Sequence, residues 1–203
     1  MAGLGAINQV GESIAALLRA RRALLDAEHR LAPVPASQDI AHLSIGKLTG
    51  TTQPGAGLSI TCFHVGRSDH QIGQRAASDP SLSMGISLEL SYLIASWSST
   101  PSEEQSQLGW AMLELSRYPV LDRAQLQGKD DWSRDETVQI VPDDSDFDRL
   151  YRLWDALKLK YRLSATFKAR VIRIGYGPDN DALPVVASRF SFSDADPLLE
   201  PAA

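Results

Sequence analysis

The sequence predicts an α+β domain, in which a mainly antiparallel or mixed sheet carries helices packed on one of its sides. Three observations lead to this fold class. Residues 81–92 alternate between small or polar and apolar side chains, which is typical of a long strand with one buried face, and the strand is predicted over 82–94. Residues 101–117 follow with apolar side chains at helical spacing. The order of predicted elements is helix, strands, helix, strand, helix and strand, which indicates the α+β class.

The N-terminal part of the chain predicts an amphipathic helix over residues 5–30. One helical face carries its apolar side chains, which are Ile7, Val10, Ile14, Leu17 and Leu18. This stripe would suit a groove on a partner, but packing on the chain's own sheet is the favoured interpretation. Residues 31–41 contain Pro33 and Pro35 and predict a linker.

Two strands and two loops are expected before residue 82. The apolar side chains of Leu43, Ile45 and Leu48 predict a weak strand, and residues 51–57 predict a turn. Residues 58–65 predict a strand with apolar side chains on both faces, which is typical of a central position. Residues 66–80 are polar and predict a loop, and a loop of this length is usually functional or disordered.

The helix predicted over residues 101–117 has clear boundaries. Thr100 to Glu103 has the pattern of a capping box, with Pro101 at the first helical position. Its apolar face is expected to consist of Leu108, Ala111, Met112 and Leu115. We expect the helix to end before Pro119.

The C-terminal half predicts irregular structure over 122–135, a strand over 136–141 and a helix over 145–157. Asp143 to Ser145 supply an N-cap, and the expected apolar face contains Phe147, Leu150, Tyr151, Trp154 and Leu157. A long strand begins at Tyr161, and its alternation slips at 171–174, which indicates a bulge. A short strand near 185–192 and a flexible acidic tail over 194–203 complete a single domain over residues 1–203.

Composition limits the class of protein. The 203 residues are 43% hydrophobic and 22% charged, which is ordinary for a globular domain with a sizeable core. The net charge of −5 argues against nucleic acid as the main partner. No apolar run is long enough to insert into a membrane, the N-terminus does not resemble a signal peptide, and Cys62 is the one cysteine. We therefore expect a protein that is cytoplasmic when made.

The residues with reactive side chains do not form a recognisable catalytic or metal site. His64 and His70 flank Asp69 without the spacing of a metal site, and His29 and His42 stand alone. Cys62 and His64 occupy alternate positions of one strand, where a structural thiol is the favoured interpretation over a nucleophile. No motif for nucleotide, serine-hydrolase or zinc chemistry occurs. We expect no catalytic residue, cofactor or metal.

One asymmetry of charge is a candidate interaction site. A basic segment without acids between 156 and 178 follows an acidic segment over 130–148. The first interpretation is two solvated faces. The second is two complementary surfaces that meet between subunits, as a head-to-tail ring requires. The interface candidates are Arg162, Lys168 and Arg170 on the basic side, with Asp143, Asp144 and Asp146 on the acidic side.

Six segments resemble one family in their order and spacing. They are residues 58–65, 88–94, 103–112, 118–121, 153–157 and 161–167. The family is the cap, or tail-terminator, protein of extracellular contractile injection systems, which are phage-tail-like particles. The resemblance covers roughly residues 5–192, while the segment 66–80 departs from the family pattern.

The resemblance implies a structural role in assembly. It implies a phage tail-terminator-like fold and a ring of six copies that closes the distal end of the inner tube and the contractile sheath. Such a ring stops polymerisation and anchors the last sheath layer, with the inner-tube protein and the sheath protein as partners, in a particle that is released from the cell. The alternative function is a small-molecule-binding or protein-binding module, or an enzyme of unknown type, on the same scaffold.

Overall fold

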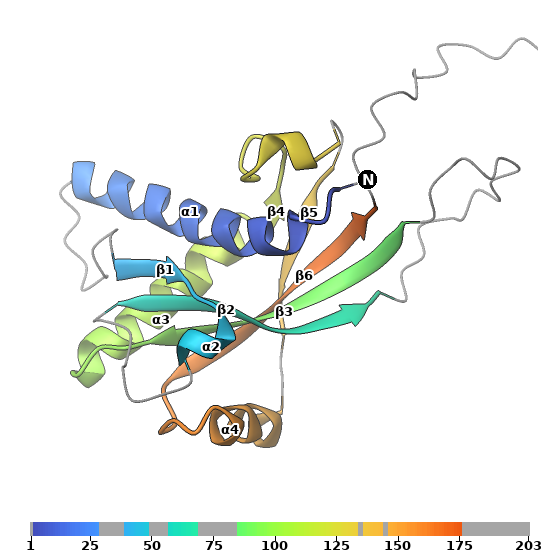
Figure 1. Cartoon of the computed structure of the whole chain (residues 1–203). Helices are drawn as coiled ribbons and strands as arrows, with labels where there is room; N and C mark the ends of the chain where they lie inside the picture. Colours follow the sequence, from blue (N-terminus) through green and yellow to red (C-terminus); the bar gives the residue numbers. More distant parts are fainter. Residues whose placement is uncertain are drawn as a thin grey trace, which may run out of the picture.

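The computed structural model describes residues 2–28, 39–48, 57–68, 85–133, 136–143 and 146–175. Six strands of these residues form one sheet in the order β1-β2-β3-β6-β5-β4 (Figure 1). The elements are α1 (Ala6–Ala27), β1 (Ile40–His42), α2 (Ile45–Leu48), β2 (Leu58–Arg67), β3 (Ile86–Ser96), α3 (Pro101–Arg117), β4 (Val120–Leu121), the 3₁₀ helix η2 (Lys129–Asp131), β5 (Val138–Pro142), α4 (Phe147–Ala156) and β6 (Ser164–Ile174). The β1–β2 pair is parallel and the other pairs are antiparallel, which confirms the predicted α+β class.

The expectation that the helices lie on one side of the sheet is wrong. Leu90, Tyr92 and Ile94 of β3 point into a large core with α1 and α3. The intervening side chains Leu93 and Ala95 point the other way, into a smaller core with α2 and α4. The two long helices therefore cover one face, and α4 lies below the opposite face (Figure 1). Alternation along β3 supplies both cores because successive strand side chains point to opposite faces.

The helix predicted over residues 5–30 is confirmed as α1, which packs its apolar stripe on the sheet. Val10, Ile14, Leu17 and Leu18 are buried in the large core, and Ile7 packs against it. An ion pair joins α1 to α3 at the edge of this core, where Arg21 Nε lies 2.8 Å from a carboxylate oxygen of the buried Glu114. The hydrogen bond that this guanidinium donates to Glu114 raises the pKa of Arg21 above its usual value.

The helix α3 begins and ends at the predicted residues. The hydroxyl of Thr100 accepts a hydrogen bond from the backbone N–H of Glu103, 3.4 Å away, and Pro101 occupies the first turn. The carboxylate of Glu103 accepts a hydrogen bond from Ser98 Oγ, which lowers the pKa of Glu103. Leu108, Ala111 and Leu115 are buried as expected, whereas Met112 is 41% exposed, so its assignment to the apolar face is wrong.

Several boundaries differ from the sequence prediction. The weak strand expected over residues 43–48 is the short helix α2. The edge strand β1 lies just before it and overlaps the last two residues of the expected linker. Strand β2 continues to Arg67, so the first two residues of the expected loop are strand. Asp146, rather than residues 143–145, caps α4, because its carboxylate accepts from Asp148 N. Strand β6 begins at Ser164 instead of Tyr161.

Two bulges flank β3 near its middle. Arg170 and Val171 of β6 lie opposite the single residue Glu89, which confirms the bulge predicted from the slip in alternation. On the other side of β3, the register shifts at Phe63 of β2. The bulged Phe63 packs against the small core, and bulges of this kind increase the local twist of a sheet.

Some predictions fall outside the described residues. They are the greater part of the linker and of the loop 66–80, the turn 51–56, the strand near 185–192 and the tail 194–203. His29, His70 and Asp144 also fall outside. In the part of the chain that the structure describes, no helix has the length and apolar character needed to span a membrane.

Candidate functional site

Four charged side chains form a cluster on the sheet face that carries α4. Glu89 of β3 accepts from two cations of β6: its carboxylate oxygens lie 3.1 Å from Lys168 Nζ and 2.9 Å from Arg170 Nε. Lys168 Nζ also lies 3.6 Å from Asp143 Oδ1. We call Glu89, Asp143, Lys168 and Arg170 the charged cluster. The structure thus brings three predicted interface residues together within one chain.

The bulge in β6 places Glu89 between the two cations. Ser91 pairs with Lys168 and Leu90 pairs with Ala169. The next residue toward the start of β3, Glu89, lies at the shift in register. There, the extra residue of β6 lets one carboxylate meet both Lys168 and Arg170. Two carboxylates and two cations balance, and all four side chains keep contact with solvent. Partly exposed pairs of this kind add little stability and weaken in salt.

The remaining predicted interface residues have separate roles. The guanidinium of Arg162 lies over the ring of Trp97, 5.9 Å from its centroid, and donates to the carbonyl oxygen of Ser98. Asp146 is the N-cap of α4, at the start of the segment that leads away from the cluster. The two sets of residues therefore do not occupy two distant patches, because Asp143 already neutralises Lys168. Their contact with a second chain stays a prediction.

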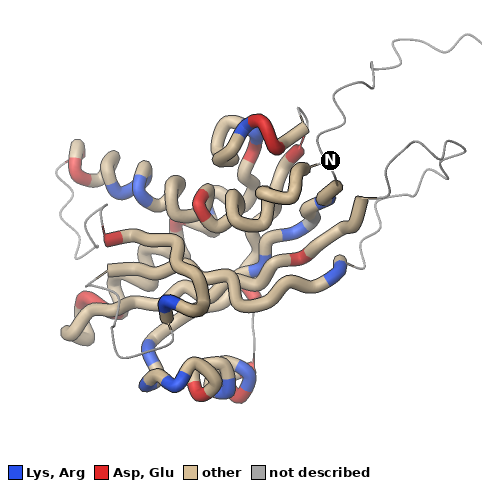
Figure 2. The backbone as a smooth tube through the Cα atoms, viewed as in Figure 1, with Lys and Arg blue, Asp and Glu red and all other residues tan. Residues whose placement is uncertain are grey.

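The sheet face around the charged cluster is open among the described residues. Helix α4 covers only the end of this face where Leu93, Ala95 and Trp97 lie. The other end of β2, β3 and β6 carries exposed basic side chains, and Figure 2 shows Lys and Arg gathered along these strands. On this face the exposed members are His64 of β2 and Arg173 of β6, whereas Arg67 pairs with Leu88 and points to the other face. This half of the sheet is polar and partly basic instead of apolar.

The same half of the sheet ends in an unpaired strand edge. Strand β1 pairs only with Leu58–Ile60, so in the described ranges no strand pairs with the outer edge of β2 from Cys62 onward. Ser68 N donates to Ser87 O at 2.9 Å, which fixes the hydrogen-bonding phase of the β2–β3 ladder. By alternation, the backbone N–H and C=O groups of Val65 and Arg67 point away from β3. These backbone groups can form hydrogen bonds with an extended segment of a partner.

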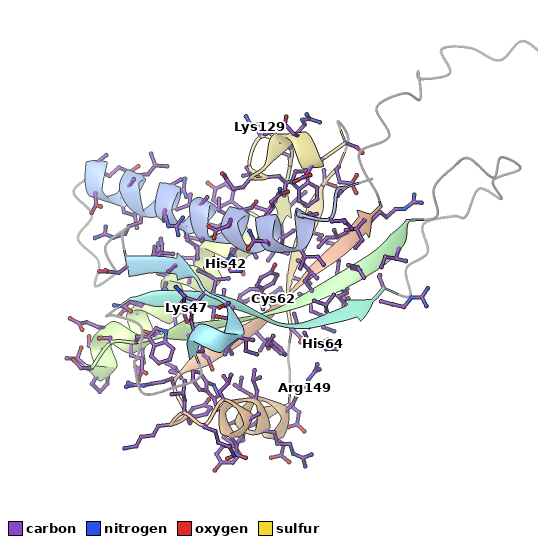
Figure 3. All side chains as sticks on the ribbon, viewed as in Figure 1. His42, Lys47, Cys62, His64, Lys129 and Arg149 are labelled. Carbon is purple, nitrogen blue, oxygen red and sulfur yellow. The ribbon has the colours of Figure 1, made fainter. Side chains whose placement is uncertain are left out.

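The pair of Cys62 and His64 does not form a nucleophilic site. The bulge at Phe63 places Cys62 opposite Tyr92 and His64 opposite Ser91, whose side chains point to opposite faces of the sheet. The expectation that the two side chains share one face is wrong, and Figure 3 shows them on opposite sides of β2. Burial raises the pKa of the Cys62 thiol, whose Sγ donates to the carbonyl oxygen of His64.

Metal-binding geometry is likewise missing from the residues that the structure describes. Among them, no group of three or more His, Cys, Asp or Glu side chains could hold a metal ion. His42 instead lies beside Glu12 of α1, with 3.2 Å between His42 Nδ1 and the Glu12 carboxylate, and its ring lies 6.5 Å from that of Tyr92. These contacts give His42 a structural place between α1 and the sheet.

Sequence reasoning missed Glu89, although it carries the centre of the charged cluster. Its ion-pair partners Lys168 and Arg170 lie about 80 residues further along the chain. One signal was available: Glu89 is the single charged residue in the alternating stretch 81–92. A single carboxylate on the polar face of a central strand predicts a cationic partner on the neighbouring strand.

Comparisons with known proteins give one family match and two structural likenesses. The family model described as the Pvc16 N-terminal domain matches residues 9–188. A PVC sheath/tube terminator of an extracellular contractile injection system, solved in its extended state, is similar in structure, with a TM-score of 0.50 and 20% identity over 95% of this chain. This chain spans 65% of that structure's length. The tube-terminating cap of the anti-feeding prophage matches at a TM-score of 0.43 and 14% identity, over 68% of this chain and 50% of that one. No curated protein matches the sequence.

Proposed function

This chain belongs to the Pvc16 N-terminal domain family, and from that premise we propose that it caps a contractile injection particle. In this proposal, copies of the chain form a ring of six at the distal end of the inner tube and the sheath. The ring stops tube polymerisation and anchors the last sheath layer. The protein is made in the cytoplasm, acts by assembly rather than catalysis, and leaves the cell in the finished particle.

The observation that carries the proposal is the extent of the family match. It covers 180 of the 203 residues, and all six segments of the resemblance lie inside it. The structural likeness to a sheath/tube terminator extends over 95% of the chain and supports the same fold. Since fold and function are separate questions, the capping role rests on family membership and on a surface that suits protein contacts.

The open half of the sheet supplies that surface. We propose that the predicted interface residues act here in one of two ways. In the first, Arg162, Lys168 and Arg170 meet Asp143, Asp144 and Asp146 of the next subunit. In the second, an acidic extension of the tube or sheath subunit adds to the free edge of β2 near Val65 and Arg67. The edge of β2 favours the second, because in the described ranges no strand pairs with its backbone groups from Cys62 onward.

The experiment that tests the capping role uses particles from cells that express the full particle gene set with a tagged copy of this chain. We expect the tag at one end of each particle, seen by gold labelling in electron micrographs. Removal of the chain should produce tubes of uncontrolled length. Tags distributed along the particle, or unchanged tube lengths without the chain, would contradict the proposal.

A second experiment separates the two uses of the charged cluster. The double variant Lys168→Glu, Arg170→Glu should lower the yield of capped particles. Salt should lower the yield from the parent chain as well, because exposed ion pairs are screened. Adding Glu89→Lys restores an intrachain ion pair and serves as the control for folding. Partial rescue by Asp144→Lys and Asp146→Lys supports the contact between subunits. Rescue by charge reversal in the tube or sheath extension supports the contact at the β2 edge.

A further inference from the structure

The connection between β5 and β6 is longer than the fold requires. These strands are antiparallel neighbours, and a two-residue turn is enough to join such a pair. The chain instead inserts 21 residues, 143–163, which include α4. The pairing of the two strands therefore does not require α4.

Helix α4 presents more aromatic surface than the sheet covers. Trp154 is buried, but Phe147 is 62% exposed, Tyr151 57% and Tyr161 39%. The exposed rings lie together: the centroid of Phe147 is 6.3 Å from that of Tyr151 and 5.9 Å from that of Tyr161. We call Phe147, Tyr151 and Tyr161 the aromatic patch. Clustered exposed apolar side chains of this size mark interaction surfaces, whereas single ones do not.

A second exposed apolar surface lies on the opposite side of the sheet, on α3. Met112 is 41% exposed and Leu113 50% exposed. Gly109, one helical turn before them, has open space where a Cβ would point, so a partner can approach the helix closely. We call Gly109, Met112 and Leu113 the α3 stripe.

We propose that the aromatic patch of one copy packs on the α3 stripe of the next copy in the ring. This inference rests on the proposed function, because a closed ring needs two different surfaces on each subunit that face away from each other. The two helices meet this condition, since α3 covers one face of the sheet and α4 the other. Methionine packs well on aromatic rings, so the exposed Met112 suits the exposed rings of Phe147 and Tyr151.

Site-directed cross-linking in assembled particles tests this contact. The full chain carries Cys62→Ser with either Met112→Cys or Tyr151→Cys, and a bis-maleimide reagent links thiols that lie close together. A mixture of the two variants should give cross-linked dimers, while either variant alone should give none. The chain with both cysteines should give a ladder that ends at the closed ring. Leu24→Cys on α1, 49% exposed, replaces Met112→Cys as the matched control and should give no ladder.

The other outcomes overturn the inference. Dimers from one variant alone indicate a two-fold contact, and links to the tube or sheath subunit assign the patch to another partner. If particles contain the chain but no cross-link forms, the proposed contact between the aromatic patch and the α3 stripe is wrong. This outcome includes the case in which residues 176–203 occupy the patch. The variant Phe147→Ser, Tyr151→Ser should keep its thermal midpoint yet lose ring formation, whereas Leu24→Ser should keep both. A chain that never enters particles contradicts the proposed function first, and the inference then falls with it.

Discussion

The two faces of the central sheet differ in what they bury. On the face under α1 and α3, a continuous apolar core includes Tyr92, Phe167 and Trp132, and burial raises the pKa of Tyr92 well above its usual value. On the other face, α4 covers a small core, and the rest is the charged cluster with an open strand edge. The same strands β3 and β6 serve both faces. One face therefore carries most of the stability and leaves the other available for contacts.

The largest expected effect tests whether the small core is needed to hold α4. Trp154 packs with Leu93, Trp97 and Leu157 and donates from Nε1 to Ser164 Oγ. We expect Trp154→Ala to lower the free energy of unfolding by about 3–5 kcal/mol, which is usual for a large core aromatic. Chemical denaturation measures it. Phe147→Ala, on the same helix but exposed, should change stability by less than about 0.5 kcal/mol, and equal losses would refute the assigned burial.

A smaller effect is expected at the contact of α1 with the covered face. A Cβ at Gly11 would lie 2.3 Å from the nearest atom of the His42 ring. Gly11→Ala should therefore destabilise the chain by about 1–3 kcal/mol through overpacking, despite the better helix propensity of alanine. The matched change Gly109→Ala on α3 meets open space and should stabilise by up to about 1 kcal/mol. Thermal unfolding of both variants decides the comparison.

A weaker effect is expected from the open face. Replacing Glu89 by Gln removes one partner from both Lys168 and Arg170. Because these pairs are partly exposed, the loss should be at most about 1 kcal/mol at low ionic strength and should vanish in high salt. Unfolding curves at two salt concentrations measure the difference. A loss that persists in high salt would mean that the cluster is structural.

The smallest effect concerns pH at the start of α3. Hydrogen bonds from Ser98 and Thr100 lower the pKa of Glu103 below its usual 4.5. A depressed folded-state pKa means that the ionised form stabilises the fold above pH 4.5 and that this contribution disappears as the pH falls below it. Between pH 3 and 6, the free energy of unfolding should therefore change less with pH for Glu103→Gln than for the parent chain. An identical pH dependence of the two chains would contradict the cap assignment.

The sequence predicted those elements whose cause is local. The boundaries of α3 follow from Thr100 and Pro101, which act within one turn. The bulge in β6 was visible as a slip in alternation. By contrast, the short segment 43–48 carries three apolar residues that suit a strand or a helix equally well, and only the tertiary contact of Leu48 with the small core selects the helix.

Whether an apolar residue is buried or exposed was harder to predict than the helix or strand to which it belongs. Phe147 and Met112 have the spacing of buried residues on their helices, yet both are exposed, because burial depends on where the sheet ends. The candidate site shows the same limit. Asp143, Lys168 and Arg170 were identified as a charged surface, but their common partner Glu89 was not, since it belongs to a strand paired across a large sequence distance.

The N-terminus closes the fold in a way that affects the order of folding. Ala2, which is fully buried, forms an isolated parallel bridge to Ile174, with hydrogen bonds to the backbone of Arg173 and Gly175. This bridge encloses nearly the whole described chain in one loop, and the entropy needed to close a loop rises with its length. We therefore expect it to form last during folding and to open first. The Gly175 amide, although bonded to Ala2, should exchange its hydrogen much faster than the amides of β3.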